Sequence, residues 1–410
     1  MKLMSDLLDT LRGNVKFGSL FTNNGTTASY KTGIAVLDYH LGYNLRVYND
    51  DGTIQGHYPA LGLQGGCYIM DIGKSSTAKT SLMLFIAGMI VRPFKNSFLL
   101  HIDLEQAMNP TRAKAMTKFT MQQMRDQYIL RQESCTMDDI KRMLMNIYKE
   151  KTVAGEKYMY DTGKKDEYGN EIITYEPTVV LIDSIPSLSV ALSETDKKDW
   201  EKLEEISSQT ERMRVTAEIG RMYTELLPYL RAANIIVISI NHIRVNPQLG
   251  IVKSPAELLY LDQNETLPGG KTPPYLAHYL FKNVAVGSEK YTKEDDGFDG
   301  FGIALKIIKA RSNQNGQVIN LVFDKNNGVS PIRSNIRFAK DNGLVGGNKN
   351  SMYFINNKDD KFSLRNVEEC FKENPNLYKI MYSHIIPILE TKLGSSDDTV
   401  ETVDEELLAY

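Results

Sequence analysis

Residues 67 to 91 read CYIMDIGKSSTAKTSLMLFIAGMIV and contain the strongest indication of the fold. The apolar run from Cys67 to Asp71 predicts a buried strand, the Gly- and Ser-rich segment predicts a turn, and Thr80 to Val91 predicts an apolar helix. A further strand is predicted from Ser97 to Ile102. Strand, helix and strand in this order form a βαβ unit, in which the two strands are parallel.

Two more apolar runs rich in β-branched residues extend this pattern, TVVLID at 178 to 183 and NIIVISIN at 234 to 241. Near-continuous apolar strands that alternate with helices are typical of a parallel sheet with both faces covered. The runs IALKIIKA at 303 to 310 and VINLVFD at 318 to 324 predict a hairpin at the edge of this sheet. The expected fold class is α/β with a mostly parallel central sheet.

The remaining segments predict additions to this core. We expect an N-terminal helical arm at residues 4 to 12 with a linker (together 1–29), a core over 30–335, a small C-terminal α/β domain over 336–393, and an acidic tail over 394–410. Residues 155 to 177 alternate tyrosine and polar residues and predict a hairpin inserted before a core strand.

The composition excludes several classes of protein. The 410 residues are 42% apolar, which is enough for a sizeable buried core. The formal net charge is −3, so any site for a polyanion must be local. Three widely separated cysteines exclude a disulfide scaffold and lack the paired spacing of a structural zinc site. No run of about 18 apolar residues occurs, so we expect a soluble cytoplasmic protein with no membrane partner.

The turn after the first strand matches the phosphate loop G-x-x-x-x-G-K-[ST], except that Ala78 replaces the second glycine. Such a loop uses backbone N–H groups for the β-phosphate, a lysine for the β- and γ-phosphates, and a hydroxyl for Mg²⁺. Lys79 and Thr80 supply the last two groups. The residues expected to bind ATP are Gly73, Lys74, Ser75, Ser76, Thr77, Ala78, Lys79, Thr80 and Ser81. The alternative is an ordinary turn of glycine and serine.

Two carboxylates follow predicted strands and fit the chemistry of such a site. Asp183, at the end of TVVLID, is placed to hold Mg²⁺ together with Thr80. Glu105, in His101 to Glu105, is placed to orient or deprotonate a water at the carboxyl edge of the sheet. The alternatives are a helix cap for Asp183 and a solvated helix start for Glu105.

Several stretches together resemble the bacterial RecA recombinase family and its T4-like phage relatives, over roughly residues 10 to 335. The similar stretches are YKTG at 30–33, HIDLEQAMNP at 101–110, VLIDS at 180–184, SINHIR at 239–244, PGG at 268–270 and LKIIKAR at 305–311. The resemblance implies a RecA-like P-loop ATPase core with Glu105 as catalytic base. It also implies adenine contacts for Asn109 and Arg112, and a γ-phosphate sensor at the position of His242.

The resemblance further implies an assembly in which ATP lies between subunits. Lys309 and Arg311 align with two cations that reach the neighbouring subunit's ATP. The family forms helical filaments on single-stranded DNA, pairs it with double-stranded DNA, and works with a single-strand-binding protein and a mediator. The DNA loops would lie at about 189 to 212 and 243 to 270. The residues expected to contact DNA are Gln209, Arg212, Arg214, Arg244, Asn246, Gly269 and Gly270.

The sequence also departs from the family pattern. His242 stands where the bacterial protein has glutamine, Arg311 replaces a lysine, and the hairpin at 155 to 177 has no counterpart. The leading interpretation is a phage-encoded, DNA-stimulated ATPase that performs homologous pairing and strand exchange in the bacterial host cytoplasm. Ala78 and His242 leave open a catalytically weak nucleotide-binding paralogue with an accessory role, and the shared core leaves open a hexameric helicase.

Overall fold

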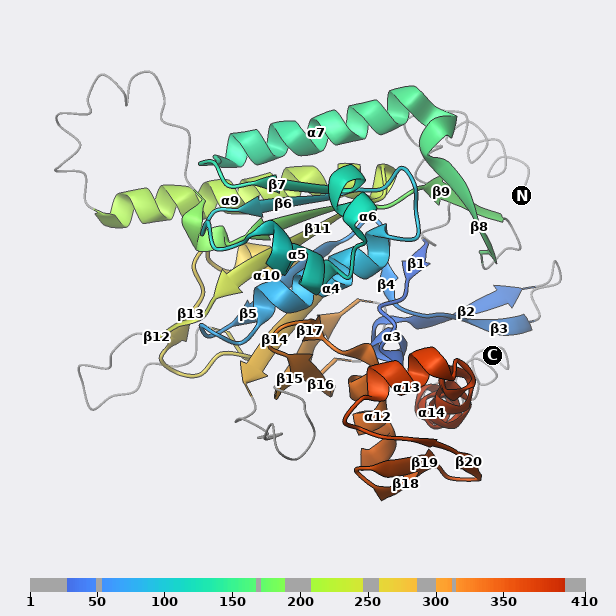
Figure 1. Ribbon diagram of the computed structural model, residues 1–410. Helices are drawn as coiled ribbons and strands as arrows, with labels where there is room; N and C mark the ends of the chain where they lie inside the picture. Colours follow the sequence, from blue (N-terminus) through green and yellow to red (C-terminus); the bar gives the residue numbers. More distant parts are fainter. Residues whose placement is uncertain are drawn as a thin grey trace, which may run out of the picture.

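The computed structural model describes residues 28–48, 54–166, 171–188, 208–245, 258–285, 300–311 and 315–394. Its centre is a nine-stranded sheet (Figure 1). In spatial order the strands are β17 (Gly328–Val329), β16 (Val318–Asp324), β15 (Gly300–Ala310), β14 (Tyr279–Ala285), β5 (Tyr68–Gly73), β11 (Ile235–His242), β10 (Thr178–Asp183), β6 (Leu99–Asp103) and β7 (Tyr128–Arg131).

The described helices are α3 (Ala35–Leu41), α4 (Lys79–Val91), α5 (Pro110–Thr117), α6 (Met121–Asp126), α7 (Met137–Ala154), α9 (Ser208–Ala232), α10 (Thr272–Leu276), α12 (Pro331–Asp341), α13 (Val367–Glu373) and α14 (Asn376–Gly394). Short 3₁₀ turns lie at Gly155–Tyr158 and Ile185–Ser187. The small sheets are β1 (Ser29–Tyr30) with β4 (Leu63–Gln64), β2 (Tyr43–Tyr48) with β3 (Ile54–Ala60), β8 (Met159–Lys165) with β9 (Glu171–Tyr175), β12 (Arg244–Val245) with β13 (Glu265–Thr266), and β18 (Val345–Asn348) with β19 (Ser351–Phe354) and β20 (Asn357–Phe362).

The central sheet is mixed. From β14 through β5, β11, β10 and β6 to β7 all neighbours are parallel, whereas β14 to β17 pair antiparallel. The chain therefore has the predicted α/β architecture with a large mixed sheet. The predicted hairpin of β15 and β16 is confirmed, although β17 and not β16 forms the edge.

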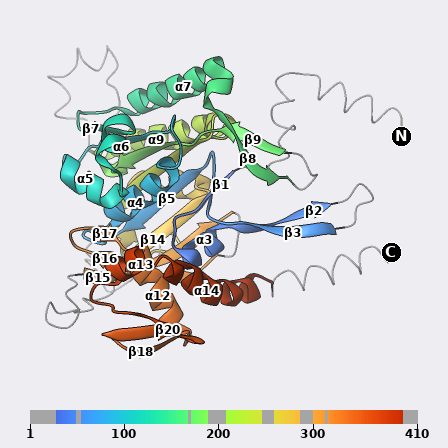
Figure 2. The same ribbon diagram turned by 45° about the vertical axis from the view of Figure 1, so that its right-hand side comes forward.

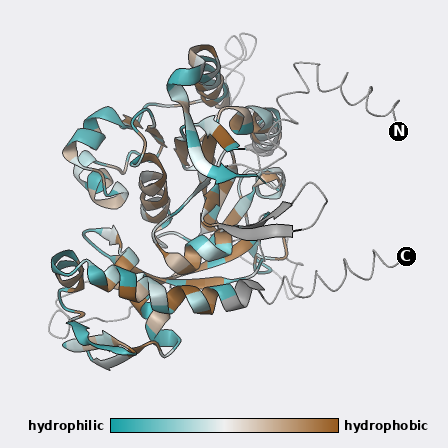
Figure 3. Cartoon of the chain, turned by 90° about the vertical axis from the view of Figure 1, so that its right-hand side faces the viewer, coloured by the Kyte–Doolittle hydropathy of each residue, from teal (hydrophilic) through white to brown (hydrophobic). Residues whose placement is uncertain are grey.

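Helices cover both faces of the sheet, as the near-continuous apolar strands predict. α4 and α5 pack on one face, whereas α7 and α9 pack on the other (Figure 1). β5, β6 and β10 are buried along their whole length because side chains on both of their faces meet helices. Figure 3 shows the apolar ribbon gathered in this interior.

The close approach of α4 to α5 depends on a glycine. A Cβ built on Gly88 would overlap the backbone carbonyl of Thr117. We expect Gly88→Ala to lower the free energy of unfolding by about 3 kcal/mol, because backbone has to move to admit the methyl group. Gly220→Ala in α9 is the matched control, since its Cβ would meet only the Thr272 side chain at 3.2 Å. Urea unfolding of both variants tests this, and equal losses would contradict it.

The inserted hairpin is confirmed as β8 and β9. It packs at its base, where the Tyr160 ring lies 4.8 Å from that of Phe94 and its hydroxyl lies 3.1 Å from that of Tyr30. Figures 1 and 2 show this hairpin and the β2–β3 hairpin extending from the same side of the molecule.

The C-terminal region contains α12, the sheet β18–β20, α13 and α14, below α3 in Figure 2. The expected domain boundary at residue 335 falls inside α12. The side chain of Asn335 in this helix accepts a hydrogen bond from the Ala35 backbone N–H at 2.9 Å. Tyr382 donates to the Gly33 carbonyl at 3.2 Å. These contacts tie the C-terminal region to the segment that leads into the core.

One boundary differs from the sequence prediction. Residues 208 to 212, expected to end the first DNA loop, form the start of α9, because Gln209, Glu211 and Arg212 favour helix. The arm at 4–12, loop residues 189–207 and 246–257, and the tail from 395 lie outside the described residues.

Candidate nucleotide site

Four parallel strands end side by side at one edge of the sheet and bring the predicted site residues together. Gly73 at the end of β5 is in register with His242 at the end of β11. Asp103 at the end of β6 is in register with Asp183 at the end of β10. Ligand sites of open α/β sheets lie beyond the carboxyl ends of the strands. The edge therefore has the position expected of the predicted nucleotide site.

The segment between β5 and α4 forms a tight loop. A Cβ on Gly73 would lie 2.7 Å from the Thr77 hydroxyl and 2.8 Å from the Asn283 carbonyl, so only glycine fits. The Lys79 ammonium donates to the Lys74 carbonyl at 2.7 Å, and the Thr77 hydroxyl donates to the same carbonyl at 2.9 Å. The loop closes over its own lysine at the N-terminus of α4, where backbone N–H groups attract anions.

Ala78, the residue that departs from the phosphate-loop motif, is the N-cap of α4 and has a left-handed conformation with φ of 57° and ψ of 26°. A left-handed conformation costs a residue with a Cβ about 1–2 kcal/mol, which explains the glycine of the motif. Ala78 packs its methyl group against the apolar core.

We expect Ala78→Gly to leave the free energy of unfolding unchanged or to raise it by up to about 1 kcal/mol, because relief of backbone strain outweighs the entropy of glycine in the unfolded chain. Ala87→Gly in the same helix is the control. Ala87 is fully buried, so this variant should lose about 1–2 kcal/mol through helix propensity and a lost methyl group. Urea unfolding compares them, and similar losses in both would contradict the assignment of strain to Ala78.

Thr80 and Asp183, the predicted metal ligands, are in direct contact. The Thr80 hydroxyl donates to Asp183 Oδ2 at 2.7 Å. Burial raises the pKa of the Asp183 carboxyl to about 6, although the hydrogen bond from Thr80 acts in the opposite direction. A bound divalent cation would favour the charged carboxylate. A hydroxyl and a buried carboxylate at the start of α4 therefore fit the Mg²⁺ of a nucleotide.

Glu105 and His242, the predicted base and sensor, form a hydrogen-bonded pair. His242 Nε2 lies 2.9 Å from Glu105 Oε1, and the Ser184 hydroxyl donates to the same oxygen at 2.8 Å. The Glu105 side chain is still 39% exposed, so water can reach it. Ser184 was not among the predicted site residues, although its position directly after Asp183 at a strand end is a signal for such a role.

The strand end at His242 also contacts the predicted second DNA loop. Asn241 donates to the Pro268 carbonyl at 2.8 Å. Gly269 and Gly270 follow with φ of 83° and 74°, a conformation that glycine adopts without strain. Arg244 is exposed in β12, opposite Thr266. Thus Arg244, Gly269 and Gly270 lie on segments that adjoin His242.

Asn109 and Arg112, the predicted adenine contacts, lie at the start of α5. The Asn109 side chain caps this helix by accepting a hydrogen bond from the Arg112 N–H at 2.9 Å. Both residues line a surface cavity of about 600 Å³ that Lys325 and Asn326 also line. The structure therefore places the two residues at one surface hollow, whose lining residues do not include any of the phosphate loop.

Lys309 and Arg311 are not brought to the phosphate loop of their own chain. The Lys309 ammonium donates to the Tyr275 carbonyl at 2.5 Å, and Arg311 contacts the Leu276 carbonyl at 3.4 Å. In the sheet register Lys309 is level with Met70, before Gly73. Their predicted partner is the ATP of a neighbouring subunit.

The structure adds charged residues that the sequence analysis missed. Asp71 and Lys79 are buried near each other, and burial raises the pKa of Asp71 and lowers that of Lys79. Lys74, a predicted ATP ligand, forms an ion pair with buried Glu265 at 3.0 Å. An acid within an apolar strand, as in YIMDIG, was the available signal for Asp71.

Some predicted residues carry no structural description. The backbone of Gln209, Arg212 and Arg214 lies in α9, but their side chains fall outside the described residues. Asn246 lies outside them entirely.

Within the described ranges, no helix combines the length and apolar character needed to cross a membrane. Comparison of the sequence with models of protein families and with curated proteins finds no match in either.

Proposed function

We propose that this chain is an ATP-dependent DNA recombinase, which forms helical filaments on single-stranded DNA and catalyses homologous pairing and strand exchange with DNA-stimulated ATP hydrolysis. The observation that carries the proposal is the hydrogen bond of 2.9 Å between Glu105 and His242 beside the phosphate loop. It links the group that would activate water to the strand end that continues into the proposed DNA loop.

The proposed mechanism follows from these contacts. Lys79 would bind the β- and γ-phosphates, while Thr80 and Asp183 would hold the Mg²⁺ that neutralises phosphate charge. Glu105 would accept a proton from water as it attacks the γ-phosphate. With ATP bound, a γ-phosphate oxygen would compete with Glu105 for His242 Nε2, since both accept the same hydrogen bond.

Signalling to DNA would run through β11 and the segment after it. His242 ends β11, Asn241 holds Pro268, and Arg244 begins the next segment. A change of partner at His242 would therefore displace both ends of the proposed DNA loop. Lys309 and Arg311, whose side chains contact the Tyr275 and Leu276 carbonyls, would complete the ATP site of the next subunit in a filament.

The test is ATP hydrolysis with and without single-stranded DNA, with electron microscopy of the same samples. We expect strong stimulation by DNA together with helical filaments, followed by strand exchange with duplex DNA. Closed rings that unwind a forked duplex would instead identify a hexameric helicase. Nucleotide binding without turnover would identify an accessory paralogue, and absence of nucleotide binding would contradict the ATPase site itself.

A further inference from the structure

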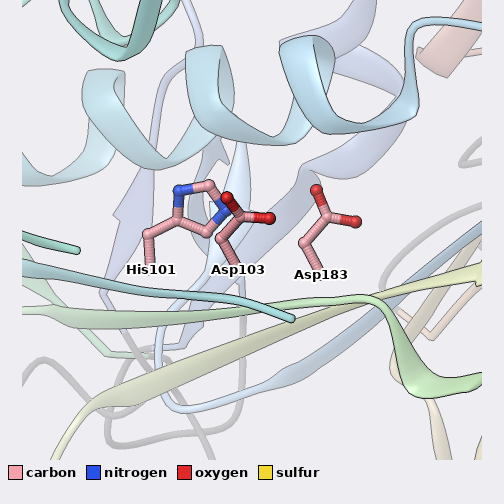
Figure 4. A group of neighbouring side chains, drawn as sticks. All are labelled: His101, Asp103 and Asp183. Atoms are coloured by element: carbon pink, nitrogen blue, oxygen red, sulfur yellow. The ribbon is translucent and has the colours of Figure 1, made fainter. Parts of the chain in front are cut away.

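A histidine and two aspartates form a buried cluster beneath the nucleotide site (Figure 4). His101 and Asp103 are two residues apart on β6, so their side chains point to the same face of the sheet. Asp183 is the register partner of Asp103 on the adjacent strand β10. Sheet geometry therefore places all three side chains together, and one ligand atom from each lies within 4.8 Å of the other two.

Each member has a buried polar atom without a hydrogen-bond partner among the described residues. These atoms are His101 Nε2, Asp103 Oδ1 and Asp183 Oδ1. The three residues are only 0%, 1% and 4% exposed. A buried polar atom without a partner costs about 1–3 kcal/mol, so a ligand that contacts all three atoms would stabilise the fold.

The second polar atom of each of these three side chains forms hydrogen bonds within the protein, and the unpartnered atom of each side chain remains available to a ligand. His101 Nδ1 lies 2.9 Å from the Tyr128 hydroxyl. Asp103 Oδ2 accepts hydrogen bonds from the Met108 N–H at 2.9 Å and from Gln132 at 2.8 Å. Asp183 Oδ2 accepts from Thr80. Such outer contacts are typical of metal ligands, because they fix the orientation of each ligand and the tautomer of the histidine.

The charge of the surroundings also favours a cation. Asp71, Asp103 and Asp183 are buried carboxylates, and Lys79 is the buried ammonium among them. With all four groups ionised, this region has an excess of negative charge, which is costly in a buried environment. A divalent cation would compensate the excess.

We propose that His101 Nε2, Asp103 Oδ1 and Asp183 Oδ1 bind a divalent transition-metal ion of the Mn²⁺ or Zn²⁺ type, independently of nucleotide. An imidazole nitrogen favours such ions over Mg²⁺, which prefers oxygen ligands and retains its water. Three ligand atoms bound to one ion by bonds of about 2.0–2.2 Å lie roughly 3–3.7 Å from one another. Because one ligand atom of each residue lies within 4.8 Å of the other two, the side chains would close by roughly 1–2 Å on binding the ion.

This site differs from the proposed Mg²⁺ site of ATP, which uses Thr80 and the other side of Asp183. Asp183 would stand between the two, with Oδ2 toward Thr80 and Oδ1 toward His101 and Asp103. The inference does not depend on ATP binding or DNA binding. Its test therefore uses the protein without nucleotide and without DNA.

The experiment is titration of the nucleotide-free protein with Mn²⁺, followed by electron paramagnetic resonance of free and bound ion. We expect one bound Mn²⁺ per chain, resistance to a tenfold excess of Mg²⁺, and a ¹⁴N coupling from imidazole in the electron spin echo. His101→Phe should remove the ¹⁴N coupling and weaken binding at least tenfold. His384→Gln, in α14 of the C-terminal region, is the control that should change neither.

A second variant protects the test if His101→Phe fails to fold in thermal unfolding. Tyr128→Phe removes the hydrogen bond to His101 Nδ1, and we expect Mn²⁺ binding about 10- to 100-fold weaker with the ¹⁴N coupling retained. Absence of Mn²⁺ binding, binding without nitrogen coupling, or binding only in the presence of ATP would overturn the proposal. Failure of the protein to hydrolyse ATP would not overturn this proposal, because the Mn²⁺ titration is carried out without nucleotide.

Discussion

Glu105→Gln should lower DNA-stimulated ATP hydrolysis by about 10²- to 10⁴-fold, the usual contribution of a general base. The substituted amide can still accept a hydrogen bond from Ser184, which lies 2.8 Å from Glu105 Oε1, but it cannot take a proton from water. ATP binding should persist, because Glu105 follows β6 and is not part of the phosphate loop. Steady-state hydrolysis and binding of a fluorescent ATP analogue measure the two effects separately.

Glu373→Gln is the matched control. Glu373 is an exposed glutamate at the end of α13, so its hydrolysis rate should equal that of the unchanged protein. Equal rates for Glu105→Gln and the unchanged protein would remove Glu105 from the reaction and would favour the accessory paralogue over the recombinase.

Lys79→Ala should abolish measurable ATP hydrolysis and weaken ATP binding by about 10²- to 10³-fold. Breaking a charge pair in a buried site costs roughly 3–5 kcal/mol, and each 1.4 kcal/mol is a factor of ten in affinity. Lys79 is 4% exposed and lies among Asp71, Asp183 and Glu105. Calorimetric titration with ATP and Mg²⁺ measures the loss.

Lys95→Ala serves as the control for lost positive charge. Lys95 is exposed in the turn after α4, so ATP affinity should not change. Because Lys79→Ala also leaves buried carboxylates without their ammonium, its fold has to be verified by thermal unfolding before the affinities are compared. A folded Lys79→Ala protein that binds ATP normally would contradict the phosphate-loop assignment.

The local elements were predictable because their signals are local. Each core element coincides, within a few residues, with an apolar run that is bounded by turn residues; these elements are β5, α4, β6, β10 and β11. Apolar runs of these lengths indicate buried strands or helices without reference to distant parts of the chain. The same reasoning located Glu105 and Asp183, because polar residues that follow buried strands reach the carboxyl edge of a sheet. His242 was indicated only by the resemblance to the RecA family.

The helix that begins at Ser208 was harder to predict. Residues 208 to 214 are mostly polar and charged, and their composition suits a loop as well as the first turns of a helix. The start of α12 at Pro331 was missed for a related reason. A proline at the first position of a helix is favourable, but in a sequence a proline also indicates a break between elements.

The order of the core strands and helices along the chain, and the chemical groups at each strand end, follow from the sequence alone. Which of these groups meet depends on the tertiary structure, because strand pairing joins residues far apart in the chain and no local pattern encodes the partner. β11 lies between β5 and β10, which brings His242 to Glu105 and Ser184. The pairing of β6 with β10 likewise places Asp183 beside His101 and Asp103, and so creates the candidate metal site.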